Sequence, residues 1–148
     1  MSKAVFISEN RPPRTQVPQS QIAKAGDFLF LSGVSARNDE GEVVGHGDIK
    51  VQTRQIFTNI KSILAVVGCD LTDIIRLTSY LAPPVSDQDA AHKYIDTRME
   101  FFGDHRPAST GVNVAGLMLP EMLVEVDVIA YAPNAVIGPN AKIIGGAQ

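Results

Sequence analysis

The sequence has one cysteine, no tryptophan and no long uninterrupted apolar run. A single thiol, Cys69, excludes an intrachain disulfide and any zinc site built from several thiolates. The three histidines lack the spacing of zinc ligands, so we expect them at the surface and predict no metal site. No stretch reaches the ~18 apolar residues of a membrane span, and the first residues lack the apolar segment of a signal peptide. These absences predict a cytoplasmic protein that does not enter a membrane.

Basic residues are also in short supply, because 13 lysines and arginines stand against 16 acidic residues and the net charge is -3. Proteins that bind nucleic acids usually carry a clustered basic face, so we expect no nucleic-acid partner. The sequence has no phosphate-binding loop, no dinucleotide fingerprint and no G-x-S-x-G motif, and we expect no cofactor. An enzyme or binding protein for small molecules fits this composition.

The length of 148 residues, 45% of them hydrophobic, allows one hydrophobic core, so we predict a single domain over residues 1–148. Its core covers about residues 19–131. Residues 8–18 form a lead with three prolines, which argues against regular structure there. Residues 132–148 contain two prolines and three glycines and are predicted to form an extended tail against a neighbouring subunit.

The first half of the core is predicted to hold a hairpin and a helix. Residues 22–25 and 28–32 flank Gly26-Asp27, a pair that tolerates the backbone angles of a tight turn. From Asp48 onward, apolar residues recur at helical spacing as far as residue 67. Asp48 can cap the start of this long amphipathic helix and Gly68 its end.

The second half is predicted to continue with a strand over residues 74–81, which stops at two prolines. A second helix then begins at a Ser86 cap and ends before Pro107. Its predicted buried stripe is formed by Ala91, Tyr94 or Ile95, Met99 and Phe102.

Two final strands, residues 110–114 and 123–131, complete the prediction. In the last strand four small apolar residues alternate with a mixed set that includes Glu125 and Asp127, so one face is wholly apolar. The apolar face is expected to meet both helices, and the mixed face to associate. We predict an α+β fold whose antiparallel-rich sheet carries two long helices on one face, built as two ββα-like halves.

Glu125 and Asp127 are candidates for chemistry because they share one strand face with apolar neighbours. A partly desolvated carboxylate has its pKa raised toward neutrality and becomes usable as a general base or acid. Both side chains could instead simply face water. The accompanying Leu123, Ile129 and Tyr131 form an unusual set to expose together, which favours a buried interface with one functional carboxylate.

Two further segments could bind an acidic ligand. After the second helix, Arg106 can grip a carboxylate, and Ser109, Thr110 and the Gly111 backbone can add donors. A surface loop that leads into a strand is the equal alternative. The strand over residues 28–31 runs into Ser32, Gly33 and Arg37, where glycine permits close approach of a ligand. Gly33 could also mark only a bulge.

Five stretches together resemble the YjgF/RidA family, the reactive intermediate or imine deaminases, whose older name is L-PSP endoribonuclease. They are GDFLFLSG (26–33), QTRQIFTNI (52–60), AVVGCDL (65–71), RPA (106–108) and LVEVDVIA (123–130). The resemblance implies a chorismate-mutase-like subunit in a homotrimer whose sheets form a central β-barrel. It also implies three sites at the subunit interfaces.

The deaminases of this family hydrolyse enamines or imines such as 2-aminoacrylate, releasing ammonia and a keto acid. The resemblance assigns the glutamate that positions water to Glu125 and the strand-end serine to Ser32. The family arginine that holds the substrate carboxylate is replaced by Ser109, so Arg106 or Arg37 would have to substitute. A family tyrosine falls on Gln19, and an asparagine falls on Ile95.

The N-terminal half is similar to the 2-aminomuconate deaminase branch, which makes a 2-aminomuconate-like dicarboxylate the first substrate to test. The alternative is a non-catalytic metabolite-binding or regulatory trimer that has lost its carboxylate clamp. Ribonuclease activity, which the older name suggests, has no support in this acidic chain without a base-stacking motif.

Overall fold

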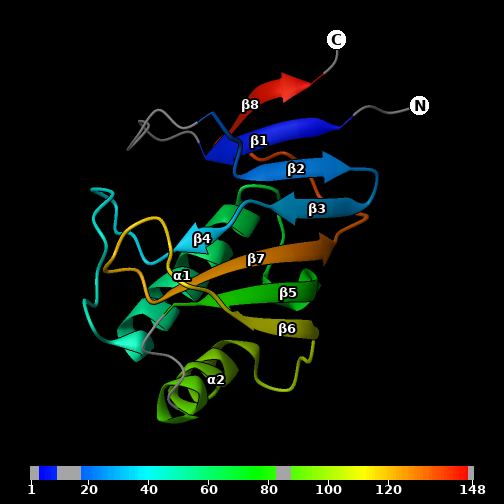
Figure 1. Ribbon diagram of the computed structural model, residues 1–148. Coiled ribbons are helices and arrows are strands. Elements are labelled where there is room, and N and C mark those ends of the chain that lie inside the picture. Colours follow the sequence, from blue (N-terminus) through cyan, green and yellow to red (C-terminus); the bar gives the residue numbers. More distant parts are fainter. Residues whose placement is uncertain (1–3, 10–17, 83–87, 147–148) are drawn as a thin grey trace.

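The computed structural model describes residues 4–9, 18–82 and 88–146, and these residues form one eight-stranded sheet with two long helices. The strands follow the order β6-β5-β7-β3-β2-β1-β8, and β4 pairs with β7 beyond the end of β3 (Figure 1). The strands are β1 (Val5–Glu9), β2 (Ile22–Ala25), β3 (Phe28–Leu31), β4 (Val34–Ser35), β5 (Ile74–Leu81), β6 (Ala108–Asn113), β7 (Val124–Tyr131) and β8 (Ala141–Gly146). The helices are α1 (Ile49–Ala65), a short 3-10 helix η1 (Leu71–Asp73) and α2 (Gln88–Phe102).

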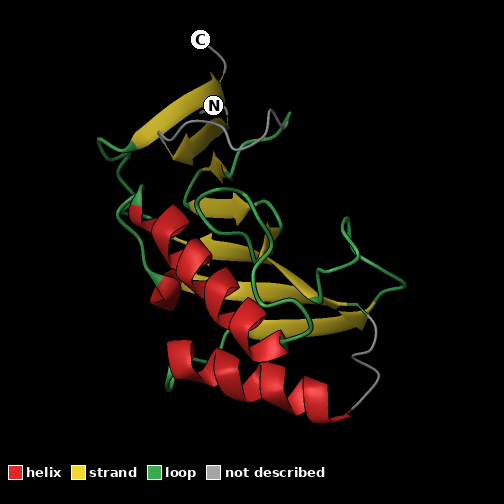
Figure 2. Cartoon of the chain, turned by 90° about the vertical axis from the view of Figure 1, so that its left-hand side faces the viewer, coloured by secondary structure: helices red, strands yellow, loops and turns green. Residues whose placement is uncertain are grey.

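Both long helices lie on one side of the sheet (Figure 2), which confirms the predicted α+β fold. All strand pairs are antiparallel except β5 with β6, which are parallel and joined through α2. The prediction of two ββα-like halves is wrong for the second half, whose order is β5, α2, β6, β7. A parallel pair needs a long crossover connection, and α2 supplies it.

Helix α1 begins where the sequence predicted it to begin. The Asp48 carboxylate accepts hydrogen bonds from Lys50 N at 2.9 Å and Val51 N at 3.2 Å, which satisfies two donors of the first turn. After the helix, Gly68 adopts a φ of +71°, a left-handed conformation that costs glycine little. Gln52, fully buried, ties α1 to the start of β7 by accepting a hydrogen bond from Leu123 N at 2.8 Å.

Helix α2 buries a narrower stripe than the sequence suggested. The cap predicted at Ser86 lies outside the described residues. Tyr94, Thr97 and Phe102 are buried, but Ile95 and Met99 are 45% and 47% exposed. The prediction that Met99 belongs to the buried stripe is therefore wrong. Helix α2 contacts α1 and η1, and the side of α2 that faces away from them stays exposed. Neither described helix combines the length and apolar character needed to cross a bilayer.

Both ends of the chain take part in the sheet, which corrects the expectation that the lead has no regular structure from residue 8 onward. Strand β1 includes the first two residues of the predicted irregular lead and ends at Glu9, before the prolines. The tail forms β8, which pairs with β1 of the same chain, Ser8 opposite Lys142. The tail is therefore extended, as predicted, and its partner strand belongs to the same chain. Pairing with β8 covers an edge of the sheet that would otherwise expose unpaired backbone groups.

The alternation predicted for β7 is confirmed and separates two environments. Val124, Val126, Val128 and Ala130 are at most 2% exposed and pack in the core beneath the helices. The intervening residues, which include Glu125 and Asp127, lie on the opposite face of the sheet, which we call the open face. The same face carries exposed aromatic side chains from β1, β3 and β7: Phe6, Phe28, Phe30 and Tyr131.

Candidate active site

Glu125 lies on the open face, between Ser35 of β4 and Tyr80 of β5 in the strand register. Its side chain is half-buried, and this burial is the main cause that raises the pKa of the carboxyl group. The negative charge of Asp127 raises the pKa further, while the positive charge of Arg37 opposes the shift. A raised pKa is the direction of shift that suits a carboxyl group to act as a general base or acid.

Gly33 provides the space into which the Glu125 carboxylate extends. A Cβ atom on residue 33 would lie 2.3 Å from Glu125 Oε1, much closer than real Cβ contacts allow. The preceding residue is tethered, because Ser32 Oγ donates to Ser20 O at 2.7 Å and Ser32 N donates to Gln21 O at 3.0 Å. Glycine at position 33 therefore reflects a close approach by the carboxylate, and the alternative of a simple bulge does not explain that contact.

Arg37 is the cation that the fold brings to Glu125. Its guanidinium donates from Nη1 to Gly41 O at 2.6 Å, so it is held by its own loop. Helix α1 fixes the backbone around it, because Asn59 Nδ2 donates to Arg37 O at 2.9 Å and to Ser35 O at 3.3 Å. Of the two arginines that the sequence proposed, Arg37 acts on Glu125.

Tyr80 joins this group, although the sequence did not single it out. Its hydroxyl donates to Asp127 Oδ2 at 3.1 Å, and this hydrogen bond is the main cause that raises the pKa of Tyr80. Tyr80 lies directly opposite Glu125 in the register of β5 and β7. Strand register depends on long-range pairing, so no local pattern could have identified this neighbour.

Ser109, Thr110 and Gly111 lie on β6, an edge strand whose six residues are all exposed. Two arginines that the sequence analysis missed donate to these hydroxyls. Arg98 Nη1 lies 2.9 Å from Ser109 Oγ, and Arg76 Nη2 lies 3.2 Å from Thr110 Oγ1. Helical and strand spacing could not reveal these contacts, because each links β6 to a different element.

Arg106 is directed elsewhere. It is exposed, and its Nη1 donates to Gly103 O and to His105 O, which are carbonyls of its own loop. The Arg106 guanidinium is therefore held by its own loop. Gln19 is exposed in the segment that precedes β2.

The histidines and the cysteine differ partly from expectation. His46 and His92 are exposed, but His105 is half-buried with Nε2 2.7 Å from Ile74 O, which corrects its predicted surface position. Cys69 is also half-buried, and burial raises the pKa of its thiol. In the part of the chain that the structure describes, His, Cys, Asp and Glu side chains form no group of three that could hold a metal ion.

The site residues divide between the two faces of the sheet. Glu125 and Tyr80 share the open face, together with Thr110 and Arg76. Ser109 lies opposite Leu77, whose side chain is buried toward the helices, so Ser109 points to the helix side of the edge strand. Within one chain, a small substrate therefore cannot contact both Glu125 and Ser109.

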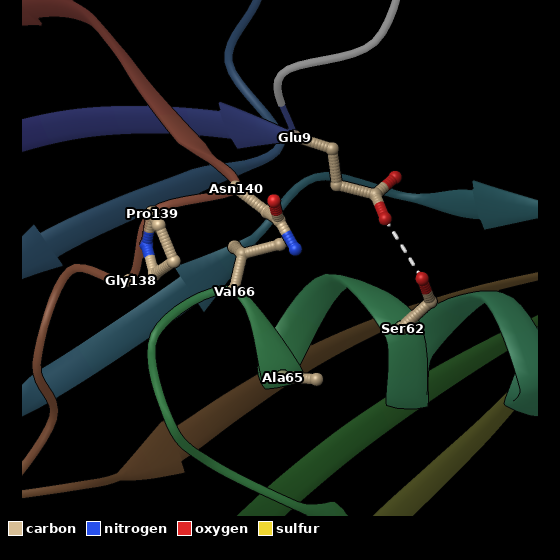
Figure 3. A pocket seen from close by; sticks show the side chains of 7 residues that line it. All are labelled: Glu9, Ser62, Ala65, Val66, Gly138, Pro139 and Asn140. Atoms are coloured by element: carbon tan, nitrogen blue, oxygen red, sulfur yellow. Dashed lines mark hydrogen bonds between the residues drawn. The ribbon is translucent and has the colours of Figure 1, made fainter.

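A separate pocket of about 280 Å³ lies between the C-terminal end of α1, β1 and the segment before β8 (Figure 3). The residues that line this pocket are Glu9, Ser62, Ala65, Val66, Gly138, Pro139 and Asn140. None of them belongs to the group of residues around Glu125. The Glu9 carboxylate in this pocket accepts a hydrogen bond from Ser62 Oγ at 2.7 Å. The hollow therefore does not coincide with the residues that could carry chemistry.

Comparison with known proteins gives the family. The sequence profile of the endoribonuclease L-PSP family matches residues 9–132. The chain belongs to this family. It is the YjgF/RidA family that the five sequence stretches resembled, so that expectation is confirmed.

Two relatives and one solved structure show the extent of the similarity. A RutC family protein of Pyrococcus horikoshii is 41% identical over 130 residues, which cover 87% of this chain and 98% of the relative. The 3-aminoacrylate deaminase RutC of Acinetobacter baylyi is 31% identical, covering 88% and 99%. The crystal structure of yeast Mmf1 matches with a TM-score of 0.76 at 28% identity, covering 87% of this chain and 98% of Mmf1.

Proposed function

We propose that the protein hydrolyses small carboxylate-bearing enamines or imines and releases ammonia. The observation that carries this proposal is the half-buried Glu125 carboxyl with its raised pKa, placed against Gly33 and beside Arg37. The Acinetobacter relative, whose name describes the deamination of an enamine acid, supports the same reaction class.

The reaction needs one group that exchanges protons with water and with the substrate nitrogen. An enamine first takes up a proton on carbon and loses one from nitrogen, and so becomes the imine. Glu125 then accepts a proton from water as the oxygen forms its bond to the imine carbon. The same carboxyl returns that proton to nitrogen, which gives an amino alcohol. The hydroxyl proton of this intermediate then passes through Glu125 to the nitrogen as the carbon–nitrogen bond breaks, so water and imine become ammonia and a carbonyl compound. Burial raises the pKa of this carboxyl, which makes the carboxylate a stronger acceptor for a proton from water.

The sites are proposed to lie between subunits of a homotrimer. The open face exposes Phe28 at 41% and Phe30 at 44% on β3, and Tyr131 at 46% on β7, the strand of Glu125. Such a patch favours association. Light scattering on the purified protein should give three times the chain mass of 15.9 kDa. A monomer would remove the interface from the proposal.

A coupled assay for ammonia tests the chemistry. The panel comprises 2-aminoacrylate, 3-aminoacrylate and 2-aminomuconate, and the dicarboxylate is the substrate that we propose to be preferred. Glu125→Ala should lose at least ~100-fold in kcat, the usual range for a lost acid–base group. Glu40→Gln, which neutralises an exposed loop carboxylate, is the matched control and should keep the wild-type rate.

Equal rates for wild type and Glu125→Ala would remove Glu125 from the mechanism. Binding of these acids by calorimetry, without turnover of any of them, would favour the alternative of a non-catalytic metabolite-binding trimer.

A further inference from the structure

Arg98 is a cation that α2 holds against the edge strand β6. Its Nη1 donates to Ser109 Oγ at 2.9 Å, and it also interacts with the hydroxyl of Tyr94. The Tyr94 hydroxyl is in turn hydrogen-bonded to Ser79 Oγ in the core. The guanidinium is thus oriented by two neutral oxygens, one of which is fixed by the buried part of the structure.

The charge of Arg98 has no acidic partner among the residues described. Side chains one turn away on a helix are the natural ion-pair partners, and here they are aromatic or aliphatic: Tyr94, Ile95, Phe101 and Phe102. Arg54 on α1 shows the contrast, because its Nη2 forms an ion pair with Glu100 Oε1 at 2.7 Å. An oriented and uncompensated guanidinium is suited to an anionic ligand.

The surroundings of Arg98 leave room for such a ligand. Gly111 lies two residues after Ser109 on the same side of β6, and a Cβ atom there would meet nothing within 4 Å. On α2, the exposed Ile95 and Met99 flank Arg98 on the outer side of the helix. A carboxylate could therefore reach the guanidinium with its apolar stem against these two side chains.

We propose that Arg98, with the Ser109 hydroxyl, binds the substrate carboxylate, and that the Glu125 acting on this substrate belongs to a neighbouring copy of the chain. This inference rests on the proposed deaminase function. It follows from the geometry, because Ser109 faces the helix side of the edge strand while Glu125 faces the open side. Only a second copy, with its open face against the α2 and β6 end of the first, brings the two groups to one small substrate.

A mixed-trimer experiment tests this arrangement. Glu125→Ala and Arg98→Ala chains with different tags are co-expressed, and trimers containing both are purified on both tags in turn. At substrate concentrations below the wild-type KM, each variant alone should be roughly 10- to 100-fold slower than wild type. In a trimer, each site takes Arg98 from one chain and Glu125 from the next. A trimer with two chains of one variant and one of the other therefore has one intact site in three, whichever variant is in excess. Its rate should return to roughly one third of wild type. If both residues acted from one chain, the mixed trimers would stay as slow as the single variants. If Arg98 had no role, Arg98→Ala trimers would by themselves be as active as wild type.

Kinetics and binding supply independent readouts. Arg98→Lys and Arg98→Gln should raise KM roughly 10- to 100-fold, because a charge-assisted pair of hydrogen bonds is lost, whereas Glu125→Ala lowers kcat. Arg54→Ala removes an exposed arginine of α1 and should leave KM unchanged. Wild-type KM in folded Arg98→Gln trimers would overturn the inference and leave the proposed function intact.

If the wild type releases no ammonia, the proposed function fails, and calorimetry with pyruvate as a small keto acid still decides the role of Arg98. Pyruvate should bind wild-type trimers and bind Arg98→Gln trimers roughly 10-fold more weakly or worse. Equal affinities, or no binding to the wild type, would overturn the carboxylate site.

Discussion

Replacement of Gly33 by alanine should damage catalysis while it leaves the fold almost unchanged. The new Cβ would lie 2.3 Å from Glu125 Oε1 and 3.0 Å from its carboxyl carbon, whereas ordinary contacts begin at 3.4 Å. The oxygen must therefore move by about 1.1 Å, the difference between 3.4 and 2.3 Å. A misplacement of ~1 Å can cost roughly 100-fold in rate, or about 2.7 kcal/mol of transition-state stabilisation.

The stability of this variant should change little. The clashing atoms are the end of a flexible side chain on the open face, so the carboxylate can turn away without moving the backbone. Gly33 does not have a positive φ, so alanine is compatible with its backbone and reduces the entropy of the unfolded chain. We expect the free energy of unfolding in urea to lie within about 1 kcal/mol of wild type.

The matched control is Gly116→Ala, where a Cβ would meet nothing within 4 Å and φ is not positive. Its kcat/KM for ammonia release should equal that of wild type. If Gly33→Ala kept the wild-type rate while Glu125→Gln lost it, the placement of the carboxylate against residue 33 would not matter. That result would refute the argument from geometry.

Two further predictions concern stability. A raised pKa means that folded Glu125 binds its proton more tightly than in the unfolded chain, so wild-type stability falls as pH rises above the ordinary value of 4.5. Urea unfolding should therefore find Glu125→Gln more stable than wild type at neutral pH, and this difference in stability should vanish below about pH 4. A difference that stays constant at all pH values would contradict burial of the charged carboxylate as its cause. Gln52→Ala should lower the free energy of unfolding by about 3 kcal/mol, because it leaves Leu123 N and the carbonyls of Gly45 and Glu121 without a buried partner. The exposed Thr58→Ala on the same helix should stay within about 0.5 kcal/mol, and a similar small loss in both variants would refute the anchoring role.

Local patterns were sufficient for most of the elements. The Asp48 cap, the turn at Gly26-Asp27 and the alternation along β7 are short-range effects of capping, backbone freedom and side-chain period, and each lies where the sequence placed it. The pattern failed for the C-terminal residues. Their pairing with β1 depends on an open sheet edge more than 130 residues earlier in the chain.

The sequence by itself determined the fold class, the family and the side of the sheet on which Glu125 lies, because periodicity and turn chemistry are encoded locally. Only the tertiary structure decided which groups meet: Gly33, Arg37 and Tyr80 around Glu125, and Arg98 against Ser109. Those contacts follow from strand register and helix packing. Both are set by the burial of the whole apolar face, and a window of neighbouring residues does not contain that information.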